Sequence, residues 1–474
     1  MLTEEVLKAK LIVQEVERMA PLPVLLGRLA GREGIFMLGD FGWRGAGRFS
    51  YLGLAPAEVV IFKQDEQGDP FTLLDQSCRR YQLKGEADLP TPFAGGWVGY
   101  LSYDLGRYIE RLPDEVEHDI PLPLLRFGFY DAIAAWDQEQ SRGYLLALEY
   151  PGQKEAVPGR LARLRVVCEA GAEGKNLLKK SDSGPAVTIP QAAQLVGRME
   201  RNIAPEAYLA KVARSIEYIK AGDIFEVNIS QRFACEYKES PAVLYEYLAH
   251  HNPAGFSALL PGANHAVVSA SPELFLLRRG ETITTKPIKG TAPRGANEAE
   301  DQKNRQWLLD SDKDRAELNM IIDLERNDLG RVCRYGTVKV LAEREIEEHP
   351  TVLHTVATIA GELRENVSNG DVLRATFPGG SITGAPKIRS MEIIDELEPT
   401  ARSVYTGSIG WIGINGDMDL NIAIRTIILA GGKAYVQAGG AIVADSEPQA
   451  EYDETLAKAG ALVQALWATK TKDK

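Results

Sequence analysis

The chain has 474 residues, a formal net charge of −12, 45% hydrophobic residues and 25% charged residues. That size allows about two or three domains of a globular protein, and no apolar run approaches the about 18 residues of a membrane span. The negative charge argues against nucleic acid or an anionic membrane as the main partner, so an anionic metabolite would need a local cation.

The first half of the chain alternates short apolar runs with turns, as in residues 93–108, 125–136 and 143–150. This pattern predicts an antiparallel, strand-rich region and not regular βαβ units. Residues 151–191 are polar and contain glycine and proline around one short helix, as expected for a connector. We therefore predict a boundary between an N-terminal region, 1–190, and a second region, 200–474.

The second half has clearer boundaries between elements. Pro205 and Gly222 flank an amphipathic helix, and residues 224–233 alternate with the period of a strand. The remaining elements expected in this half are strands at 265–277, 403–414, 419–430 and 433–443 and helices at 311–326, 385–397 and 450–468. Long strands between amphipathic helices favour an α+β protein with antiparallel sheets.

The cysteines and the first residues indicate where the protein works. The four cysteines are far apart and form no C-x-x-C pair, and residues 1–20 are charged throughout, unlike a secretory signal. We therefore expect a cytoplasmic protein with reduced cysteines, and neither a zinc site nor a catalytic cysteine.

The segment PIKGTAPRG, residues 287–295, carries one primary amine in a constrained turn. Pro287 fixes the backbone, Gly290 allows a tight bend, and Lys289 lies between them. A neutral lysine amine is a good nucleophile, but its ordinary pKa is about 10.4, so we expect burial or a cationic neighbour to lower it. The alternative is a lysine that pairs with a phosphate or carboxylate.

Two predicted helices carry acidic pairs three residues apart. Asp314 and Glu317 continue the apolar stripe of one helix, and Glu451 and Glu454 continue that of the last helix. Carboxylates that point inward need a cation, and hard oxygen ligands without histidine or cysteine suit Mg²⁺. The alternative is carboxylates that the helix dipole favours near a helix start.

Several other residues are candidates for binding an anion or for acid catalysis. Arg425 stands in an apolar run and is either a ligand or a structural ion-pair partner, and Lys458 follows Glu454 by one helical turn. Glu273 begins an apolar run where burial would raise its pKa and suit a general acid, although it could also cap a turn. His354 is expected to be a packed or hydrogen-bonding residue.

Two glycine-rich segments complete the candidate site. Residues 377–387, FPGGSITGAPK, precede a helix whose backbone N–H groups could bind an anion, but the segment lacks the spacing of a nucleotide-binding P-loop. Residues 437–446, QAGGAIVADS, end a strand with two adjacent glycines that would let backbone donors approach an anion.

Taken together, DKDRAELNMIIDLERNDLGR, FPGGSITGAPKIRSMEIIDELEP, YTGSIGW, IAIRT and AGGAIVADSEPQAEYDET closely resemble the chorismate-utilising enzymes. These include anthranilate synthase component I, aminodeoxychorismate synthase component I, and the isochorismate and salicylate synthases. The resemblance covers nearly all of residues 200–465, and FAGGWVGYLSYDLGRYIERLP extends it more weakly into the first half. It implies two large antiparallel β-sheets packed as a sandwich with helices on the outside.

Within this family, Lys289 distinguishes two activities. Anthranilate synthases typically carry alanine in this motif, whereas aminodeoxychorismate synthases carry PIKGT, as here. The resemblance therefore implies amination of chorismate at C4: the Lys289 amine attacks C2, Glu273 protonates the departing C4 hydroxyl, and ammonia then adds at C4 and expels the lysine. The product is 4-amino-4-deoxychorismate, a precursor for p-aminobenzoate and folate synthesis.

The resemblance also assigns roles to other residues. It implies that Glu317 and Glu454 bind Mg²⁺, with Asp314 and Glu451 supporting them through water. Contacts with the substrate fall on Gly290, Thr291, His354, Tyr405, Arg425, Gly439, Gly440, Ala441 and Lys458.

Two residues depart from the family pattern. Ala441 replaces a usual glycine, although its backbone N–H can still donate. Glu226 stands where the water-activating relatives carry lysine and the ammonia-using ones often carry glutamine, which argues against isochorismate or salicylate synthase activity.

The chain has no glutaminase nucleophile motif, so we expect free ammonia or a separate glutamine amidotransferase subunit to supply nitrogen. No fused aminodeoxychorismate lyase is evident, so another enzyme would release p-aminobenzoate. Two alternative hypotheses for the function remain. One is anthranilate synthase component I, and the other is a catalytically silent family member that binds chorismate or tryptophan. Residues 38–50 do not closely match the family's tryptophan motif, which leaves tryptophan binding open.

Overall fold

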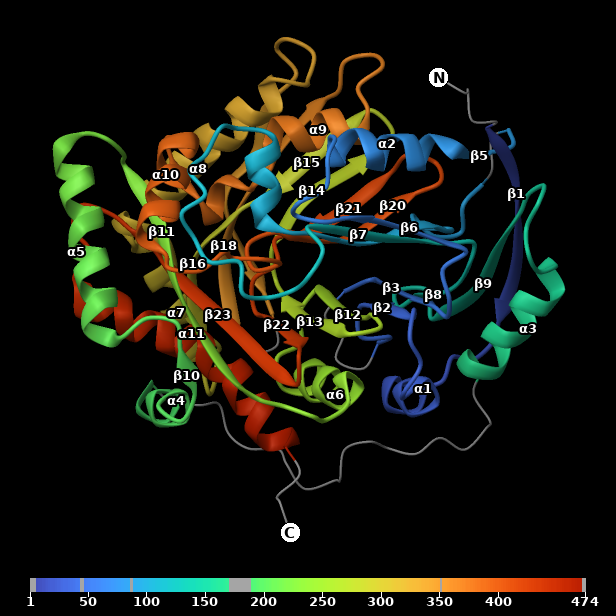
Figure 1. Cartoon of the computed structure of the whole chain (residues 1–474), viewed down its shortest axis with the longest axis horizontal. Coiled ribbons are helices and arrows are strands. Elements are labelled where there is room, and N and C mark those ends of the chain that lie inside the picture. The colour runs from blue at the N-terminus through green and yellow to red at the C-terminus, as the bar shows by residue number, and fades with distance from the viewer. Residues whose placement is uncertain (1–5, 43–46, 86–87, 170–188, 350–351, 471–474) are drawn as a thin grey trace.

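The computed structural model of the chain describes residues 6–42, 47–85, 88–169, 189–349 and 352–470. Within these ranges the strands form two sheets, shown one above the other in Figure 1. The larger sheet has 13 strands, in the order β10 (Glu200–Arg201), β11 (Glu226–Glu236), β23 (Lys433–Ile442), β22 (Thr426–Ala430), β13 (His265–Ser271), β12 (Phe256–Pro261), β2 (Phe36–Leu38), β3 (Phe49–Gly53), β8 (Ala132–Asp137), β9 (Arg142–Glu149), β1 (Leu7–Val16) and β5 (Tyr81–Leu83), with β19 (Gly384–Ala385) paired to β11.

The second sheet has 10 strands within the same ranges. Their order is β16 (Ile288–Pro293), β18 (Val352–Glu362), β15 (Thr282–Lys286), β14 (Leu274–Arg279), β21 (Met418–Asn421), β20 (Ser408–Gly413), β6 (Gly96–Leu101), β7 (Leu125–Tyr130) and β4 (Glu58–Phe62), with β17 (Lys339–Glu348) paired to β18. Strands β1 and β5 run parallel, and the other described strand pairs, such as β11 with β23, are antiparallel.

Helices cover the outer faces of both sheets, so the sequence-based expectation of an α+β sandwich is confirmed (Figure 1). Helices α2, α8 and α9 lie over the smaller sheet, α1, α4, α6 and α11 lie under the larger one, and α10 packs against β11 and β19 of the larger sheet. The helices are α1 (Leu22–Leu29), α2 (Pro70–Arg80), α3 (Val157–Cys168), α4 (Ile189–Val196), α5 (Pro205–Ala221), α6 (Pro241–His251), α7 (Glu298–Asp310), α8 (Asp312–Gly330), α9 (Asn369–Thr376), α10 (Lys387–Leu397) and α11 (Pro448–Thr469), with short 3-10 turns η1 (Tyr103–Tyr108) and η2 (Gly380–Ile382).

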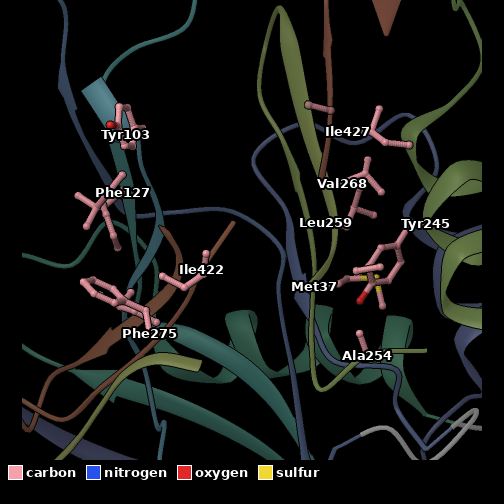
Figure 2. Packing of buried hydrophobic residues seen from close by; sticks show 14 of the residues in the cluster. Met37, Tyr103, Phe127, Tyr245, Ala254, Leu259, Val268, Phe275, Ile422 and Ile427 are labelled. Carbon is pink, nitrogen blue, oxygen red and sulfur yellow. The ribbon is translucent and has the colours of Figure 1, made fainter. Parts of the chain in front are cut away.

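Both sheets continue across the two halves of the chain. Strand β12 pairs with β2 in the larger sheet, and β20 pairs with β6 in the smaller one. Figure 2 shows the same mixing in the core, where Met37 from the first half lies beside Leu259 and Tyr245 from the second. The division into regions 1–190 and 200–474 therefore describes the order of the sequence, and as a domain boundary it stays a prediction.

Two segments that were expected to be single strands, 265–277 and 419–430, are each two strands in different sheets. The first comprises β13 and β14, separated by Pro272, which has no N–H to donate to a strand neighbour. The second comprises β21 and β22, separated by residues 422–425. The chain therefore crosses from one sheet to the other at two places.

The expected connector, 151–191, contains α3 and the first residues of α4, and its residues 170–188 lie outside the described ranges. The four cysteines are all free, as expected. Among the described helices, none is long and apolar enough to cross a membrane.

Candidate active site

The two sheet crossovers bring together an acid and a cation. Glu273 lies between β13 and β14, and Arg425 lies between β21 and β22. The Ile422 N–H donates to the Glu273 carbonyl at 3.0 Å, and the Ala270 N–H donates to the Arg425 carbonyl at 3.0 Å, so each crossover supports the other. Arg425 was expected within a strand, but the chain turns there, with a φ of 48° in the left-handed region.

Glu273 is suited to donate a proton. Its side chain is buried, with 4% of the residue exposed, and Ser381 Oγ donates to Glu273 Oε1 at 2.5 Å. Burial raises the pKa of Glu273 to about 7, and the Ser381 hydroxyl and the Lys289 ammonium only partly oppose that rise. The expectation that burial would raise this pKa is confirmed, and a carboxyl with such a pKa is a competent general acid near neutral pH.

Arg425 is a cation for which the described part of the chain supplies no ion-pair partner. Within the described ranges its guanidinium makes no ion pair and no hydrogen bond, although the Glu273 carboxylate lies near enough to influence it. Burial lowers its pKa. Of the two roles left open by the sequence, the ligand role fits this arrangement and the structural ion pair does not.

Lys289 lies on β16 and its side chain reaches into the space between the two sheets. The residue is 8% exposed, its Nζ donates to Glu226 Oε1 at 2.7 Å, and it lies 3.9 Å from Glu317 Oε2. The lysine therefore points toward the acidic helix α8 and not toward solvent, as the sequence-based mechanism requires.

The charge of Lys289 differs from the expectation. Burial lowers the pKa of this lysine, but the carboxylates of Glu226 and Glu317 outweigh burial, so its pKa lies above the ordinary value. No cationic neighbour lowers it, and the amine is protonated in the protein as the structure describes it. The prediction of a neutral amine is wrong, because β11 places a carboxylate beside it.

The two acidic helices face one another, as predicted. Lys313 Nζ lies 3.8 Å from Glu317 Oε1 on α8 and 3.8 Å from Glu451 Oε1 on α11. Both carboxyl groups are buried, and burial raises the pKa of each. The ammonium of Lys313 thus lies where a cation between the helices is expected.

The remaining members of the acidic set differ in their surroundings. Glu454 forms an ion pair with Lys458 at 2.6 Å and its side chain is about half exposed. Burial raises the pKa of Glu454, but the neighbouring Lys458 ammonium lowers it by more. The pKa of Glu454 therefore lies below its ordinary value. Across the described parts of the chain, no three His, Cys, Asp or Glu side chains lie close enough together to hold one metal ion. The expected convergence of four carboxylates is therefore not present.

The carboxylate oxygens of the two acidic helices are nevertheless the type of ligand that Mg²⁺ prefers. This ion commonly takes one or two protein carboxylates, and water and substrate oxygens complete its shell. Glu317 and Glu451 supply two facing carboxylates, and Asp314 lies beside the tight turn at Gly290, where an added Cβ would meet Asp314 Oδ2 at 3.1 Å. The φ of Gly290 is 86°, which explains the need for glycine.

Thr291 and His354 lie on paired strands, β16 and β18. The Thr291 hydroxyl lies 2.9 Å from His354 Nδ1, and His354 Nε2 is buried without a partner in the described structure. Burial lowers the pKa of His354 to about 3, helped by Arg425, so the ring is neutral. A hydrogen-bonding role is therefore favoured over a role as base, as the sequence suggested.

Gly439, Gly440 and Ala441 lie within β23 and not in a loop. They pair with β11 on one side, whereas the pairing of β23 with β22 ends at Val436. Lys458 Nζ donates to the Gly439 carbonyl at 3.1 Å. An added Cβ at Gly440 would lie 3.1 Å from Glu451 Oε2, so this strand passes directly beside the acidic helix α11.

Tyr405 closes the site near the same strand. The ring is buried, and burial raises the pKa of its hydroxyl. The guanidinium of Arg402 lies 5.9 Å from the centre of the ring. Arg402 itself donates from Nη2 to Glu398 at 2.7 Å, so a buried ion pair lies beside the Tyr405 ring.

Sequence reasoning missed three features of this site. Ser381 orients the acid Glu273, although its segment, 377–387, was singled out only for its backbone donors. Lys313 bridges the acidic helices, and only its position one residue before Asp314 hints at that role. Glu226 contacts Lys289, which no local pattern predicts because 63 residues separate them.

A cavity of about 310 Å³ lies apart from these residues, where the first half of the chain meets the second. Its lining includes Arg48, Tyr51, Arg279, Trp411 and Asp419. Residues 39, 47 and 49 of the segment compared with the tryptophan motif also line it, whereas 43–46 lie outside the described ranges.

Comparisons with known proteins identify the family of the chain. The model of the chorismate binding enzyme family matches residues 41–464. Aminodeoxychorismate synthase component 1 of Bacillus subtilis (strain 168) is 36% identical over 441 residues, which cover 90% of this chain and 91% of that protein. The Escherichia coli (strain K12) protein of the same name is 40% identical and covers 86% of each chain. Anthranilate synthase component 1 of Thermus thermophilus is 41% identical and covers 88% of this chain and 89% of its own.

Solved structures show the same fold. Anthranilate synthase component I from Streptococcus pneumoniae TIGR4 matches with a TM-score of 0.76 and 30% identity, over 88% of this chain and 92% of that chain. MenF, the menaquinone-specific isochorismate synthase of Escherichia coli, matches with a TM-score of 0.67 over 98% of this chain and 97% of its own, at only 17% identity. Because the family model spans most of the sequence and these relatives match over most of their length, the chain belongs to the family of chorismate binding enzymes.

Proposed function

We propose that this protein aminates chorismate at C4 with ammonia and forms 4-amino-4-deoxychorismate, the precursor of p-aminobenzoate in folate synthesis. Relatives named for C4 amination and for anthranilate synthesis are similar to this chain at comparable identity, so overall similarity does not decide between them. The observation that carries the proposal is Lys289, a buried primary amine that points between the two sheets toward the acidic helix α8.

The reaction begins with attack by the Lys289 nitrogen on C2 of the ring. The lysine must first lose one proton, since its ammonium form has no free electron pair. As the nitrogen–carbon bond forms, the ring double bonds shift and the C4–oxygen bond breaks, and Glu273 donates the proton that lets the hydroxyl leave as water. Ammonia then adds at C4, the double bonds shift back, and the C2–nitrogen bond of Lys289 breaks, which releases the neutral lysine amine. The new C4 ammonium loses one proton, which restores the Glu273 carboxyl, so chorismate and ammonia give product and water.

Chorismate carries two carboxylates, and the site offers cations for them. The unpaired guanidinium of Arg425 suits one carboxylate. Glu317 and Glu451 face one another, whereas Glu454 pairs with Lys458. We therefore propose that Glu317 and Glu451, in place of the expected pair Glu317 and Glu454, would hold Mg²⁺, with Asp314 nearby, and that this ion would neutralise and fix the other carboxylate. The backbone of β23 beyond Val436, which has no β22 partner, can donate to substrate oxygens.

Nitrogen would come from ammonia that a separate glutaminase subunit releases. The relatives are named component 1, and such a name is consistent with a partner component. The chain itself carries no glutaminase nucleophile motif. The competing function is anthranilate synthesis, in which ammonia attacks C2 directly and Lys289 forms no bond to substrate.

An ammonia-dependent turnover assay with chorismate and Mg²⁺ tests the proposal. We expect 4-amino-4-deoxychorismate, detected as p-aminobenzoate after an added lyase, and no fluorescent anthranilate. Lys289→Ala should slow C4 amination at least about 100-fold, because the nucleophile is lost. The matched control is Lys286→Ala, in which the lost amine pairs with Glu347 of β17 and lies outside the proposed site.

Two results would overturn the proposal. Anthranilate as the main product of the wild-type protein would assign the competing function. C4 amination by Lys289→Ala at the rate of the Lys286→Ala control would exclude the covalent step. Intact-protein mass spectrometry with chorismate and Mg²⁺, but without ammonia, should show an adduct on the wild-type protein and none on Lys289→Ala.

A further inference from the structure

Glu226 makes a contact that joins the two sheets inside the candidate site. It begins β11 of the larger sheet, and its Oε1 accepts the hydrogen bond from Lys289 Nζ, which β16 carries from the smaller sheet. Glu226 is fully buried, with 0% exposure, and its second oxygen, Oε2, has no partner within the described structure. A buried carboxylate is costly unless it is paired, so this contact is the main compensation for placing Glu226 there.

The backbone around Glu226 is fixed by its neighbours. Glu226 pairs with Ala385 of β19, and its carbonyl accepts a hydrogen bond from Ser390 Oγ of α10 at 3.0 Å. Gly384 approaches so closely that an added Cβ would lie 2.1 Å from the Glu226 carbonyl oxygen. The Glu226 carboxylate therefore projects from a backbone position that β19 and α10 hold in place.

Lys289, in contrast, has a flexible four-carbon side chain, and the register of its strand shifts between Ile288 and Thr291. The position of its amine thus depends on what the amine binds. Glu226 Oε1 is the near partner at 2.7 Å, and Glu317 Oε2 of the acidic helix lies at 3.9 Å. Without Glu226, the amine is expected to move toward Glu317, away from the place that the rigid strand assigns to it.

We propose that Glu226 is a positioning residue that holds the Lys289 amine at its point of attack and keeps it away from the acidic helices. The inference rests on the proposed function and deepens it, because attack by the lysine amine on the ring then depends on the contact between Glu226 and Lys289. A displacement of about 1 Å at a reacting atom costs about 100-fold in rate. The shift of the amine toward Glu317 would also place a competing cation at a carboxylate that we assign to Mg²⁺.

Two variants of Glu226 and one control separate this role from a structural one. Glu226→Leu keeps the side-chain bulk but removes the acceptor, and Glu226→Gln keeps an acceptor oxygen but removes the charge. Glu236→Gln makes the same chemical change at the exposed end of the same strand, β11, and serves as the control. All are made in the full chain and compared by thermal unfolding first.

We expect Glu226→Leu to lower kcat for C4 amination by about 10- to 100-fold, while the KM for chorismate changes by less than about threefold. The lysine adduct seen by mass spectrometry without ammonia should form more slowly by the same factor. Glu226→Gln should recover a substantial part of both rates. Mg²⁺ titrated calorimetrically into the protein without substrate should bind several-fold more weakly to Glu226→Leu than to the Glu236→Gln control.

The inference is overturned if Glu226→Leu forms the adduct at the wild-type rate. It is also overturned if the Leu and Gln variants lose activity equally with unchanged Mg²⁺ affinity, which a general structural role would produce. If Glu226→Leu does not fold, the adduct rate and Mg²⁺ affinity of Glu226→Gln decide, and values equal to those of the control refute the role. Failure of the proposed function is recognised separately, because the wild-type protein then makes no 4-amino-4-deoxychorismate.

Discussion

Replacing Glu273 with glutamine should stabilise the protein at alkaline pH while it removes the proposed proton donor. Burial raises the pKa of Glu273 from 4.5 to about 7, and each pH unit of such a change corresponds to about 1.4 kcal/mol. Ionising this carboxyl in the folded protein therefore lowers the free energy of unfolding by about 3 kcal/mol. Glutamine stays neutral at every pH and can still accept the hydrogen bond from Ser381.

The sign of the pH dependence follows from the raised pKa. A group that holds its proton more tightly when folded stabilises the protein fully below its unfolded pKa, and that contribution is lost as pH rises through the folded value. For Glu273 this loss runs from 4.5 to about 7. The stability of Glu273→Gln relative to wild type should therefore increase by about 2 to 3 kcal/mol between about pH 5 and about pH 8.5.

Urea unfolding at these two pH values measures the effect, with Glu236→Gln as the control for a neutralised, exposed glutamate. Taking the difference between variant and wild type removes the titration of all other groups. The same variant should lose C4 amination by about 100-fold or more, because amide nitrogen is no proton donor of this kind. A stability difference that is identical at both pH values would show that Glu273 is not a desolvated carboxyl and would refute the reasoning.

Two further substitutions probe the substrate and metal contacts. Arg425→Gln should raise the KM for chorismate by about 10- to 100-fold, as expected for losing one charge-assisted hydrogen bond, and an unchanged KM in steady-state kinetics would exclude a carboxylate at this residue. Gly440→Ala places a Cβ 3.1 Å from Glu451 Oε2 and should weaken Mg²⁺ binding at least about tenfold in calorimetric titration, with Gly330→Ala, where an added Cβ meets no atom within 4 Å, as the comparison.

The sequence predicted elements well where local chemistry defines both ends. The helix at 205–222 is α5: proline at its first turn fixes the backbone, and Gly222 closes it with a φ of 84° in the left-handed region. The last helix, expected at 450–468, was equally clear from its apolar period. Both signals act over a few residues, so no knowledge of the rest of the chain was needed.

The prediction of single strands at 265–277 and 419–430 is wrong because contacts between residues far apart in the sequence decide how these segments fold. Each segment has the apolar residues of a continuous strand, because both of its parts are buried in a sheet. Which sheet each part joins depends on neighbours far away in the sequence. Pro272 was a usable sign of the first break, whereas the turn at Arg425 left no comparable mark in the sequence.

The same limit applies to the site. The types of residue and their approximate roles could be predicted, because carboxylates and cations interrupting apolar patterns need a chemical reason. The charge of Lys289 could not, because it depends on Glu226, which a different sheet supplies. Pairing between distant carboxylates and amines is decided by the packing of the sheets, and no local spacing encodes it.

The two crossovers show why the chemistry lies where it does. A chain that passes from one sheet to the other must leave the regular hydrogen-bond pattern, and at these points its side chains face the space between the sheets. Glu273 and Arg425 occupy the two crossovers, and neither is neutralised by an ion pair within the described structure, although both lie in a poorly solvated place. Such an arrangement is unfavourable for folding alone. A dianionic ligand would use the unpaired guanidinium, and a departing hydroxyl would take the proton that burial keeps on the carboxyl, so the unfavourable electrostatics of the folded protein become favourable in the complex.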